Sequence, residues 1–297
     1  MMFDEVNRFN SPKAIEAGKQ VMAVVVQHNK FNQVFNNCIQ QIELMQSIRT
    51  PGGILIQADP GMGKTLMLQM VKKHLTDQGN AKEANRCLHI QLDSGVDTHK
   101  LATSMVYGLG FPMMPARLSL ENMNQMISKG MERLRPLALL IDEAQHMCEG
   151  NRDITARALT DWLKVRMDLF GMPVICTGTR TLERLSMINP QFVSRASTTF
   201  VMDAFDAGDE WRQVLAAFAQ MVTAVDLSVL TGPMFKPIHF ATKGNMRALK
   251  KLLLFGVMHA AENHKNGDKP ILTLTDLSVA YEFTYGEVTG RANPFIK

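Results

Sequence analysis

Hydrophobic residues gather in short runs that alternate with longer amphipathic stretches through the first two thirds of the chain. The runs lie at residues 53–57, 87–92, 137–141, 173–177 and 198–202. Most are apolar at nearly every position, which is typical of strands buried on both faces of a parallel sheet. Strands that alternate with helices predict an α/β fold with a parallel sheet.

The stretches between the runs carry apolar residues at helical spacing. They predict helices at residues 29–47, 66–78, 98–110, 119–135 and 151–170. Asp97 and Ser119 stand where helix-capping residues are expected. After residue 206 the pattern is mainly helical, with segments at 210–225 and 244–264 and another that opens at Thr275.

This change of pattern at residue 206 divides the chain into regions. Residues 1–28 mix polar and small side chains, and we expect them to form an N-terminal arm. Residues 29–206 are predicted to form the domain that contains the sheet, with helices on both faces. Residues 207–290 are predicted to form a small helical domain, and residues 291–297 a C-terminal tail.

The most informative stretch follows the first apolar run. It reads Ala58-Asp59-Pro60-Gly61-Met62-Gly63-Lys64-Thr65-Leu66. A strand, a glycine-containing loop and a helix, in this order, predict a phosphate-binding loop. Gly61 and Gly63 let backbone N–H groups point inward at the helix N-terminus. We expect Lys64 to reach the β- and γ-phosphates of ATP and Thr65 to bind Mg²⁺, and we expect the loop to tolerate Ala58 in place of glycine.

Two carboxylates, Asp142 and Glu143, end the apolar run at 137–141. Asp142 is expected to hold Mg²⁺ through water, opposite the Thr65 hydroxyl. Glu143 is expected to polarise the water that attacks the γ-phosphate. Together with the phosphate-binding loop, these acids predict a nucleoside triphosphatase with a water nucleophile.

Polar residues near the last two runs complete the predicted hydrolysis site. Thr177 and Thr179 end the run at 173–177, and one of them is expected to bond the γ-phosphate or the attacking water. Thr179 is preferred, because Gly178 lets the chain turn inward. Arg195 precedes the last run, from where a cation could reach the nucleotide of a neighbouring subunit. An ordinary surface arginine is the alternative.

Composition narrows the class of protein. Hydrophobic residues at 46% and charged residues at 20% are typical of a globular protein. The apolar runs are too short to span a membrane and the N-terminus lacks a signal-peptide pattern, so we expect a cytoplasmic protein without membrane contact. The four cysteines lack the spacing of metal ligands and are expected to be packing residues.

The net charge of +4 is unevenly distributed along the chain. Residues 236–269 hold seven lysines and arginines against two acidic residues. A basic face of this kind can meet the phosphate backbone of a nucleic acid. A solvated helix surface is the alternative interpretation.

Three motifs taken together resemble the AAA+ ATPases, and more narrowly the TniB/TnsC-type regulators of transposition. They are Asp-Glu-Ala-Gln-His at 142–146, Thr-Gly-Thr at 177–179 and Asn-Pro-Gln-Phe-Val-Ser-Arg at 189–195. The resemblance implies an αβα ATPase domain with a small helical lid, and homo-oligomeric rings or helical filaments on double-stranded DNA. It also implies that ATP controls the recruitment of a transposase, often together with a target-selecting protein.

The resemblance also implies roles for single residues. Lys64 and Thr65 match the Walker A pair, and Asp142 and Glu143 match the Walker B pair. Thr179, or Thr177, matches the first sensor, Arg195 the arginine finger and Arg247 the second sensor of the lid. Ala196 stands where the family often has phenylalanine, which leaves Arg180 and Arg184 as competitors for the finger.

DNA contacts are implied for the segment after the second strand, at Thr98, His99 and Lys100. A lysine near a helix start adds sequence-independent affinity for DNA. The alternatives are an exposed capping turn at these residues, or a separate basic cluster at Lys129, Arg133 and Arg135 on the helix at 119–135.

Two other functions compete with transposition. A secretion- or signalling-type AAA+ ATPase shares the run at 142–146, but such chains usually add a membrane segment or a ligand-binding domain. A scaffold that uses ATP to assemble and hydrolyses little of it is the other alternative, against which the intact Glu143 argues.

Overall fold

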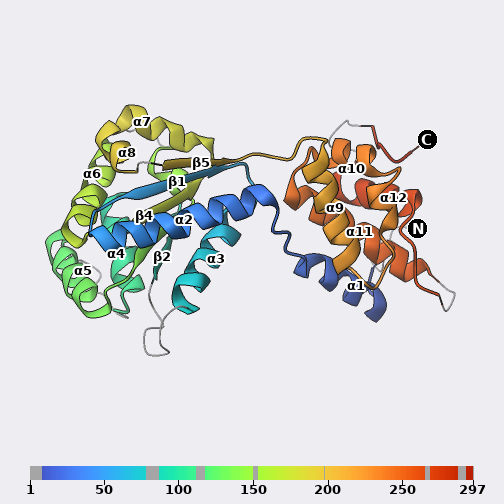
Figure 1. Ribbon diagram of the computed structural model, residues 1–297, viewed down its shortest axis with the longest axis horizontal. Coiled ribbons are helices and arrows are strands. Elements are labelled where there is room, and N and C mark those ends of the chain that lie inside the picture. The colour runs from blue at the N-terminus through green and yellow to red at the C-terminus, as the bar shows by residue number, and fades with distance from the viewer. Residues whose placement is uncertain are drawn as a thin grey trace. The chain divides into compact units, whose positions relative to one another are not determined.

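The computed structural model describes residues 9–77, 87–111, 118–149, 153–196, 198–264, 268–286 and 292–296 (Figure 1). These residues belong to two compact units. We call residues 30–203 the sheet unit. We call residues 204–297, together with the residues up to Asn29, the helical unit.

The sheet unit is built on strands that match the predicted runs to within one residue at most ends. They are β1 (Gly53–Ala58), β2 (Cys87–Gln91), β3 (Ala138–Asp142), β4 (Val174–Gly178) and β5 (Thr198–Met202). All are parallel, in the order β2-β3-β4-β1-β5. The predicted parallel sheet is confirmed, and β4 lies between the strand before the phosphate-binding loop and the strand that ends in the acids.

Helices cover both faces of this sheet. They are α2 (Asn29–Ile48), α3 (Lys64–Asp77), α4 (Thr98–Gly108), α5 (Leu120–Leu134), α6 (Asp153–Phe170), α7 (Leu185–Ile188) and α8 (Pro190–Arg195), with short 3₁₀ turns η1 (Ala144–Met147) and η2 (Arg180–Arg184). Leu139 and Ile141 of β3 belong to a core that includes α4, α5, α6 and α8. Because successive strand residues face opposite sides, Leu140 faces the other layer, where α3 contacts the strands.

Side-chain caps set the starts of two of these helices. Asp97 accepts a hydrogen bond from the backbone N–H of Lys100 at 2.8 Å and begins α4. Ser119 accepts one from the N–H of Asn122 at 3.2 Å and begins α5. Each cap satisfies one of the N–H groups that a helix start leaves without an internal partner. Both predicted helix starts are confirmed.

The helical unit contains two helices that the hydrophobic pattern did not predict. Its elements are α1 (Pro12–Ala23), α9 (Asp209–Met221), η3 (Ser228–Thr231), α10 (Phe235–Thr242), α11 (Met246–Asn263) and α12 (Leu274–Tyr285). The additional helices are α1 and α10. Gly244, with φ of 67°, joins α10 to α11, and a Cβ there would lie 1.9 Å from the Phe205 carbonyl oxygen.

Residues 12–23 of the expected N-terminal arm form helix α1 and pack against α11. Ala14, Ala17, Gly18 and Val21 are buried at helical spacing. These small residues let the two helices approach closely, since a Cβ at Gly18 would lie 2.9 Å from the sulfur of Met258. The structure therefore places this stretch in the helical unit, where the sequence led us to expect an arm.

The expected C-terminal tail also packs, in the part that the structure describes. Phe295 is buried, and its ring centroid lies 6.1 Å from that of Tyr281 in α12. Asn293 donates hydrogen bonds to the backbone oxygen of Ser278 at 3.1 Å and to Glu282 at 2.8 Å. These contacts fix residues 292–296 on α12.

Two further sequence expectations can be compared with the described residues. No helix among them combines the length and the apolar character needed to cross a membrane. The four cysteines are buried and unpaired, as expected of packing residues. Burial raises the pKa of Cys38 and of Cys176 to about 12, so these thiols stay protonated and unreactive.

Candidate nucleotide and hydrolysis site

The phosphate-binding loop connects β1 to α3. Ala58 is the last, buried residue of β1, residues 59–63 form the turn, and Lys64, Thr65 and Leu66 open the helix. Gly61 and Gly63 have φ of 89° and 91°, the left-handed conformations that the loop requires of glycine. The loop therefore has the curled backbone at a helix N-terminus that binds phosphate groups.

Lys64 is buried at 6% exposure, although it carries a charge. Its Nζ donates to the carbonyl oxygen of Ala58 at 2.9 Å and lies 3.4 Å from that of Asp59. The ammonium group is thus held over the loop by the backbone itself. A buried ammonium is stable only with such oxygen partners, and phosphate oxygens would bind it more strongly because they are charged.

Asp142 joins three elements at the carboxyl edge of the sheet. Its Oδ2 accepts a hydrogen bond from Oγ1 of Thr65 in α3 at 2.7 Å. Its Oδ1 accepts one from Oγ1 of Thr177 in β4 at 2.7 Å and one from the N–H of Glu143 at 2.9 Å. Asp142 is almost fully buried, and these bonds satisfy the carboxylate. The structure brings Thr65, Asp142 and Thr177 together, although they lie far apart in the sequence.

Glu143 follows directly and has the left-handed φ of 53°. Its Oε2 accepts a hydrogen bond at 2.5 Å from Nε2 of Gln145, a buried amide in η1. Oε1 of Gln145 accepts a hydrogen bond at 3.2 Å from the backbone N–H of Thr179. The structure thus connects Glu143 to Thr179 through a residue that the sequence analysis did not select.

Thr177, within β4, and Thr179, directly after it, have different surroundings. Thr177 is fully buried, and its hydroxyl is used by Asp142. The Thr179 hydroxyl is buried and has no hydrogen-bond partner among the described residues. Of the two, Thr179 has the hydroxyl that can take a partner from a ligand.

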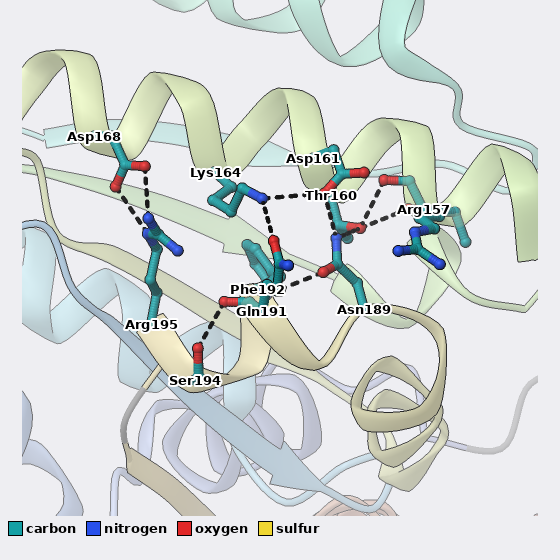
Figure 2. A network of polar contacts seen from close by, with 11 residues as sticks. Arg157, Thr160, Asp161, Lys164, Asp168, Asn189, Gln191, Phe192, Ser194 and Arg195 are labelled. Atoms are coloured by element: carbon teal, nitrogen blue, oxygen red, sulfur yellow. Dashed lines mark hydrogen bonds and ion pairs between the residues drawn. The ribbon is translucent and has the colours of Figure 1, made fainter.

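Arg195 lies at the end of α8 and forms an ion pair with Asp168 of α6 (Figure 2). Nε and Nη2 of Arg195 donate to the two carboxylate oxygens of Asp168, each at 2.8 Å. Both side chains are more than a third exposed. An exposed ion pair stabilises a protein by about 1 kcal/mol or less. Arg195 can therefore leave Asp168 for a partner that binds it more strongly.

The other end of α8 is anchored by Asn189, which is 2% exposed (Figure 2). Its amide nitrogen donates to Thr160 at 2.8 Å and to Asp161 at 2.9 Å, and its oxygen accepts from the N–H of Phe192 at 3.1 Å. The bond from Asn189, followed by the effect of Lys164, lowers the pKa of Asp161 below its usual value. Asn189 therefore fixes the short helix that carries Arg195.

We expect Asn189→Ala to lower the free energy of unfolding of the sheet unit by about 2 kcal/mol, because it removes a helix cap and the anchor to α6. Chemical denaturation measures this change. Met187→Ala, at a 77% exposed residue of the preceding helix α7, is the control and is expected to cost less than about 0.5 kcal/mol. Equal stability of the two variants would contradict the anchoring role.

The two competing arginines, Arg180 and Arg184, also form ion pairs within the sheet unit. Arg180 pairs with Asp203 and lies 4.0 Å from Asp59 of the phosphate-binding loop. Arg184 donates to the backbone oxygen of Cys148 at 2.6 Å and to Asp153 at 3.1 Å.

Arg247 belongs to the helical unit, at the start of α11. Its side chain is exposed, and its backbone N–H is capped by Asn245 at 3.0 Å.

The segment after β2 borders a pocket of about 220 Å³ between β2 and α4. Gln91, Asp93, Lys100 and Ser104 are among its lining residues. Lys100 is exposed, and its ammonium donates to the backbone oxygen of Gly95 at 2.9 Å. Thr98 opens α4, and an imidazole nitrogen of His99 lies 3.0 Å from the carbonyl oxygen of Leu118.

In the alternative basic cluster on α5, two of the three side chains have structural roles at the end of the helix. Arg133 donates to the backbone oxygen of Leu109 at 2.7 Å and lies over the ring of Phe111. Arg135 is the left-handed residue that ends α5, whereas Lys129 is exposed. The helix end therefore explains the positions of both arginines.

Gln145, Asn189 and Asp168 are the site residues that sequence reasoning missed. Gln145 and Asn189 lie inside the quoted motifs, so their position was a usable signal. Asp168 is one of several acids on an amphipathic helix, and nothing in the sequence distinguishes it.

The sheet order, the loop after β1 and the two acids at the end of β3 define a P-loop domain of the AAA+ ATPase class. Solved structures of that class share the fold. Aeropyrum pernix ORC1 in complex with DNA has a TM-score of 0.67 at 13% identity, covering 91% of this chain and 70% of that chain. Domain III of the Thermotoga maritima replication initiation protein DnaA has a TM-score of 0.54 at 14% identity, covering 91% and 96%.

Aeropyrum pernix ORC2, in its ADPNP-ADP complexes, gives a TM-score of 0.64 at 13% identity and covers 92% of this chain and 74% of that chain. The family model "Bacterial TniB protein" matches residues 19–203. This match covers more than half of the chain, and the protein belongs to the TniB family. No match was found among curated protein sequences.

Proposed function

We propose that this protein is an ATP-dependent DNA-binding regulator of transposition, which hydrolyses ATP to ADP and phosphate. The observation that carries the proposal is the cluster in which Asp142 accepts hydrogen bonds from Thr65 and Thr177, beside the phosphate-binding loop and Glu143. This arrangement has the groups that bind a nucleoside triphosphate and activate water. Membership of the TniB family supports the regulatory role.

ATP would bind with its phosphates in the loop at residues 58–66, where N–H groups and Lys64 meet the negative charge. Thr65 and Asp142 fit Mg²⁺, because their oxygens are hard ligands that already lie 2.7 Å apart. Mg²⁺ in such sites is held by one or two protein ligands together with phosphate oxygens and water. Mg²⁺ would supply charge neutralisation at the phosphates.

Hydrolysis would depend on four further side chains. Glu143 takes the proton from the attacking water, and Thr179 bonds the γ-phosphate or that water. Arg195 leaves Asp168 and stabilises the charge that develops on the γ-phosphate of the ATP bound to a neighbouring subunit. Arg247 is the phosphate contact that a lid would supply.

DNA binding is the second part of the proposal. Thr98 and Lys100 at the start of α4 are the proposed contacts, with a backbone-directed and sequence-independent character. Aeropyrum pernix ORC1 in complex with DNA and Drosophila ORC bound to DNA share the fold, and this supports DNA as the partner. The oligomer on double-stranded DNA would be a ring or helical filament that recruits a transposase and meets a target-selecting protein.

Electron microscopy of the purified protein with duplex DNA and a slowly hydrolysed ATP analogue tests the proposal. Rings or filaments that coat the DNA only with nucleotide are the expected result, together with ATPase activity that rises when DNA is added. DNA binding that does not require nucleotide, or an ATPase rate that is unchanged by added DNA, would contradict the proposal.

We expect Arg195→Ala to lower the DNA-stimulated ATPase rate by about 10³-fold, the effect of removing an arginine that reaches a neighbour's nucleotide. Arg195→Lys should not restore the rate, because an ammonium lacks the planar fork of donors. Steady-state phosphate release measures both. Arg157→Ala, at an exposed arginine of α6, is the control and should keep the wild-type rate.

A mixing experiment shows whether Arg195 acts between subunits. Arg195→Ala subunits keep an intact loop and an intact Glu143, and Glu143→Gln subunits keep an intact Arg195 and are expected to bind ATP and assemble. If the arginine acts in a neighbour's site, mixing these two inactive proteins restores part of the activity. No gain on mixing would assign Arg195 to its own subunit.

A further inference from the structure

Gln145 makes one hydrogen bond with each end of its side-chain amide. Nε2 donates to Oε2 of Glu143 at 2.5 Å, and Oε1 accepts from the backbone N–H of Thr179 at 3.2 Å. A carboxylate only accepts and a backbone N–H only donates, so the amide can be oriented in one way only. A single side chain, 4% exposed, therefore connects the residue after β3 to the residue after β4.

The backbone at Gly178 lies close against this amide. A Cβ at Gly178 would lie 2.7 Å from Oε1 of Gln145 and 3.0 Å from its backbone nitrogen. Glu143 has a left-handed φ of 53°, which is uncommon for a residue with a side chain. Such a conformation persists only where the surrounding contacts impose it. The hydrogen bond from Gln145 is one of those contacts.

The hydroxyl of Thr179 lies on the residue whose N–H Gln145 holds. Its Oγ1 is buried and lacks a hydrogen-bond partner within the described part of the chain. A buried hydroxyl without a hydrogen-bond partner destabilises the structure, and a phosphate oxygen or a water molecule would supply the missing bond. Binding at Thr179 would therefore act on the segment to which Gln145 is bonded.

We infer that Gln145 is a positioning residue that couples Thr179 to Glu143, an inference that rests on the proposed ATPase function. When the terminal phosphate of ATP pairs with the Thr179 hydroxyl, it fixes the segment whose N–H binds Oε1 of Gln145. The other end of the same amide then orients the Glu143 carboxylate toward the attacking water. Glu143 takes its working position only when the γ-phosphate is in place, so hydrolysis is regulated by the nucleotide itself.

The test is Gln145→Met, which keeps the length of the side chain and removes both hydrogen bonds. We expect kcat for ATP to fall about tenfold or more, while KM changes less than about threefold, because the phosphate-binding loop is intact. Gln46→Met is the matched control. Gln46 donates to the backbone oxygen of Leu137 at 2.7 Å, away from the acids, and its loss should leave kcat unchanged.

The decisive comparison repeats Gln145→Met in a Glu143→Gln protein, with ATP hydrolysis followed in single-turnover assays. Because Gln145 acts through Glu143, the second substitution should lower the residual rate by less than about twofold. An equal loss in both backgrounds would assign Gln145 a packing role and overturn the inference. Should Gln145→Met fail to fold in thermal unfolding, Gln145→Glu, which sets a second carboxylate against Glu143, carries the same comparison.

The outcomes separate the inference from the function on which it rests. Wild-type protein that hydrolyses ATP, combined with an unchanged kcat for Gln145→Met, overturns the inference alone. Wild-type protein that hydrolyses no ATP, with or without DNA, overturns the inference and the proposed ATPase together.

Discussion

Lys64→Ala is expected to weaken ATP binding by about 10²–10³-fold and to abolish nucleotide-dependent coating of duplex DNA. The Lys64 ammonium is buried and lies 2.9 Å from the carbonyl oxygen of Ala58, at the centre of the phosphate-binding loop. Removing one partner of a buried, hydrogen-bonded charge pair costs about 3–4 kcal/mol, which corresponds to that loss of affinity. Titration calorimetry with ATP and Mg²⁺ measures the affinity, and electron microscopy shows the coating.

Lys73→Ala is the matched control for this experiment. Lys73 lies on the same helix and is exposed, so its loss removes an equal charge without touching the loop. Its ATP affinity and DNA coating should equal those of the wild-type protein. If Lys64→Ala coats DNA as well as the parent does, nucleotide bound at this loop does not hold the oligomer together, and the proposed function fails.

Glu143→Gln is expected to slow ATP hydrolysis by about 10²–10⁴-fold, the contribution of a general base. The amide cannot take a proton from water, whereas its shape and its place beside Gln145 are retained. ATP affinity should change little, because Lys64 and Thr65 are untouched. Oligomers on DNA should therefore outlive those of the wild-type protein, since hydrolysis is the step proposed to release them. A DNA-dissociation time course after ATP removal measures their lifetime.

Glu149→Gln is the control for this prediction, because Glu149 is exposed and bonded to His146 at 2.5 Å. It should hydrolyse ATP at the wild-type rate. Unchanged hydrolysis in Glu143→Gln would remove Glu143 as the base. Slow hydrolysis combined with wild-type release from DNA would instead favour a scaffold in which turnover sets no timing.

The strands could be predicted because each is a local, nearly continuous apolar run. Helices α4 and α5 could be predicted with their starts, because Asp97 and Ser119 cap them through neighbours in the sequence. Helix α1 could not, because its buried stripe consists of alanine, glycine and one valine. Such a stripe has little hydrophobic contrast, and it becomes meaningful only against α11.

Part of the candidate site could also be predicted from the sequence. The loop at residues 58–66 and the pair Asp142 and Glu143 are contiguous, so backbone chemistry and spacing identify them. The sequence could not show which of Thr177 and Thr179 keeps a hydroxyl for a ligand, since both lie at the end of the same run. The answer depends on which hydroxyl bonds to Asp142, and the register of the neighbouring strands decides that.

Asp168 illustrates the limit most clearly. It pairs with Arg195 from 27 residues away, across two helices that meet because Asn189 anchors α8 to α6. No rule of sequence spacing predicts such a pair, because the two residues meet only when the helices that carry them pack together.

The sequence by itself determined the parallel α/β class, the phosphate-binding loop and the acids that follow a buried strand. Each of these depends on interactions among residues close together in the chain, or on a period that a few positions reveal. The tertiary structure alone decided that Thr65, Asp142 and Thr177 share one cluster and that Gln145 connects Glu143 to Thr179. Those bonds need distances near 3 Å between separate strands and turns, and only packing of the whole sheet sets such distances.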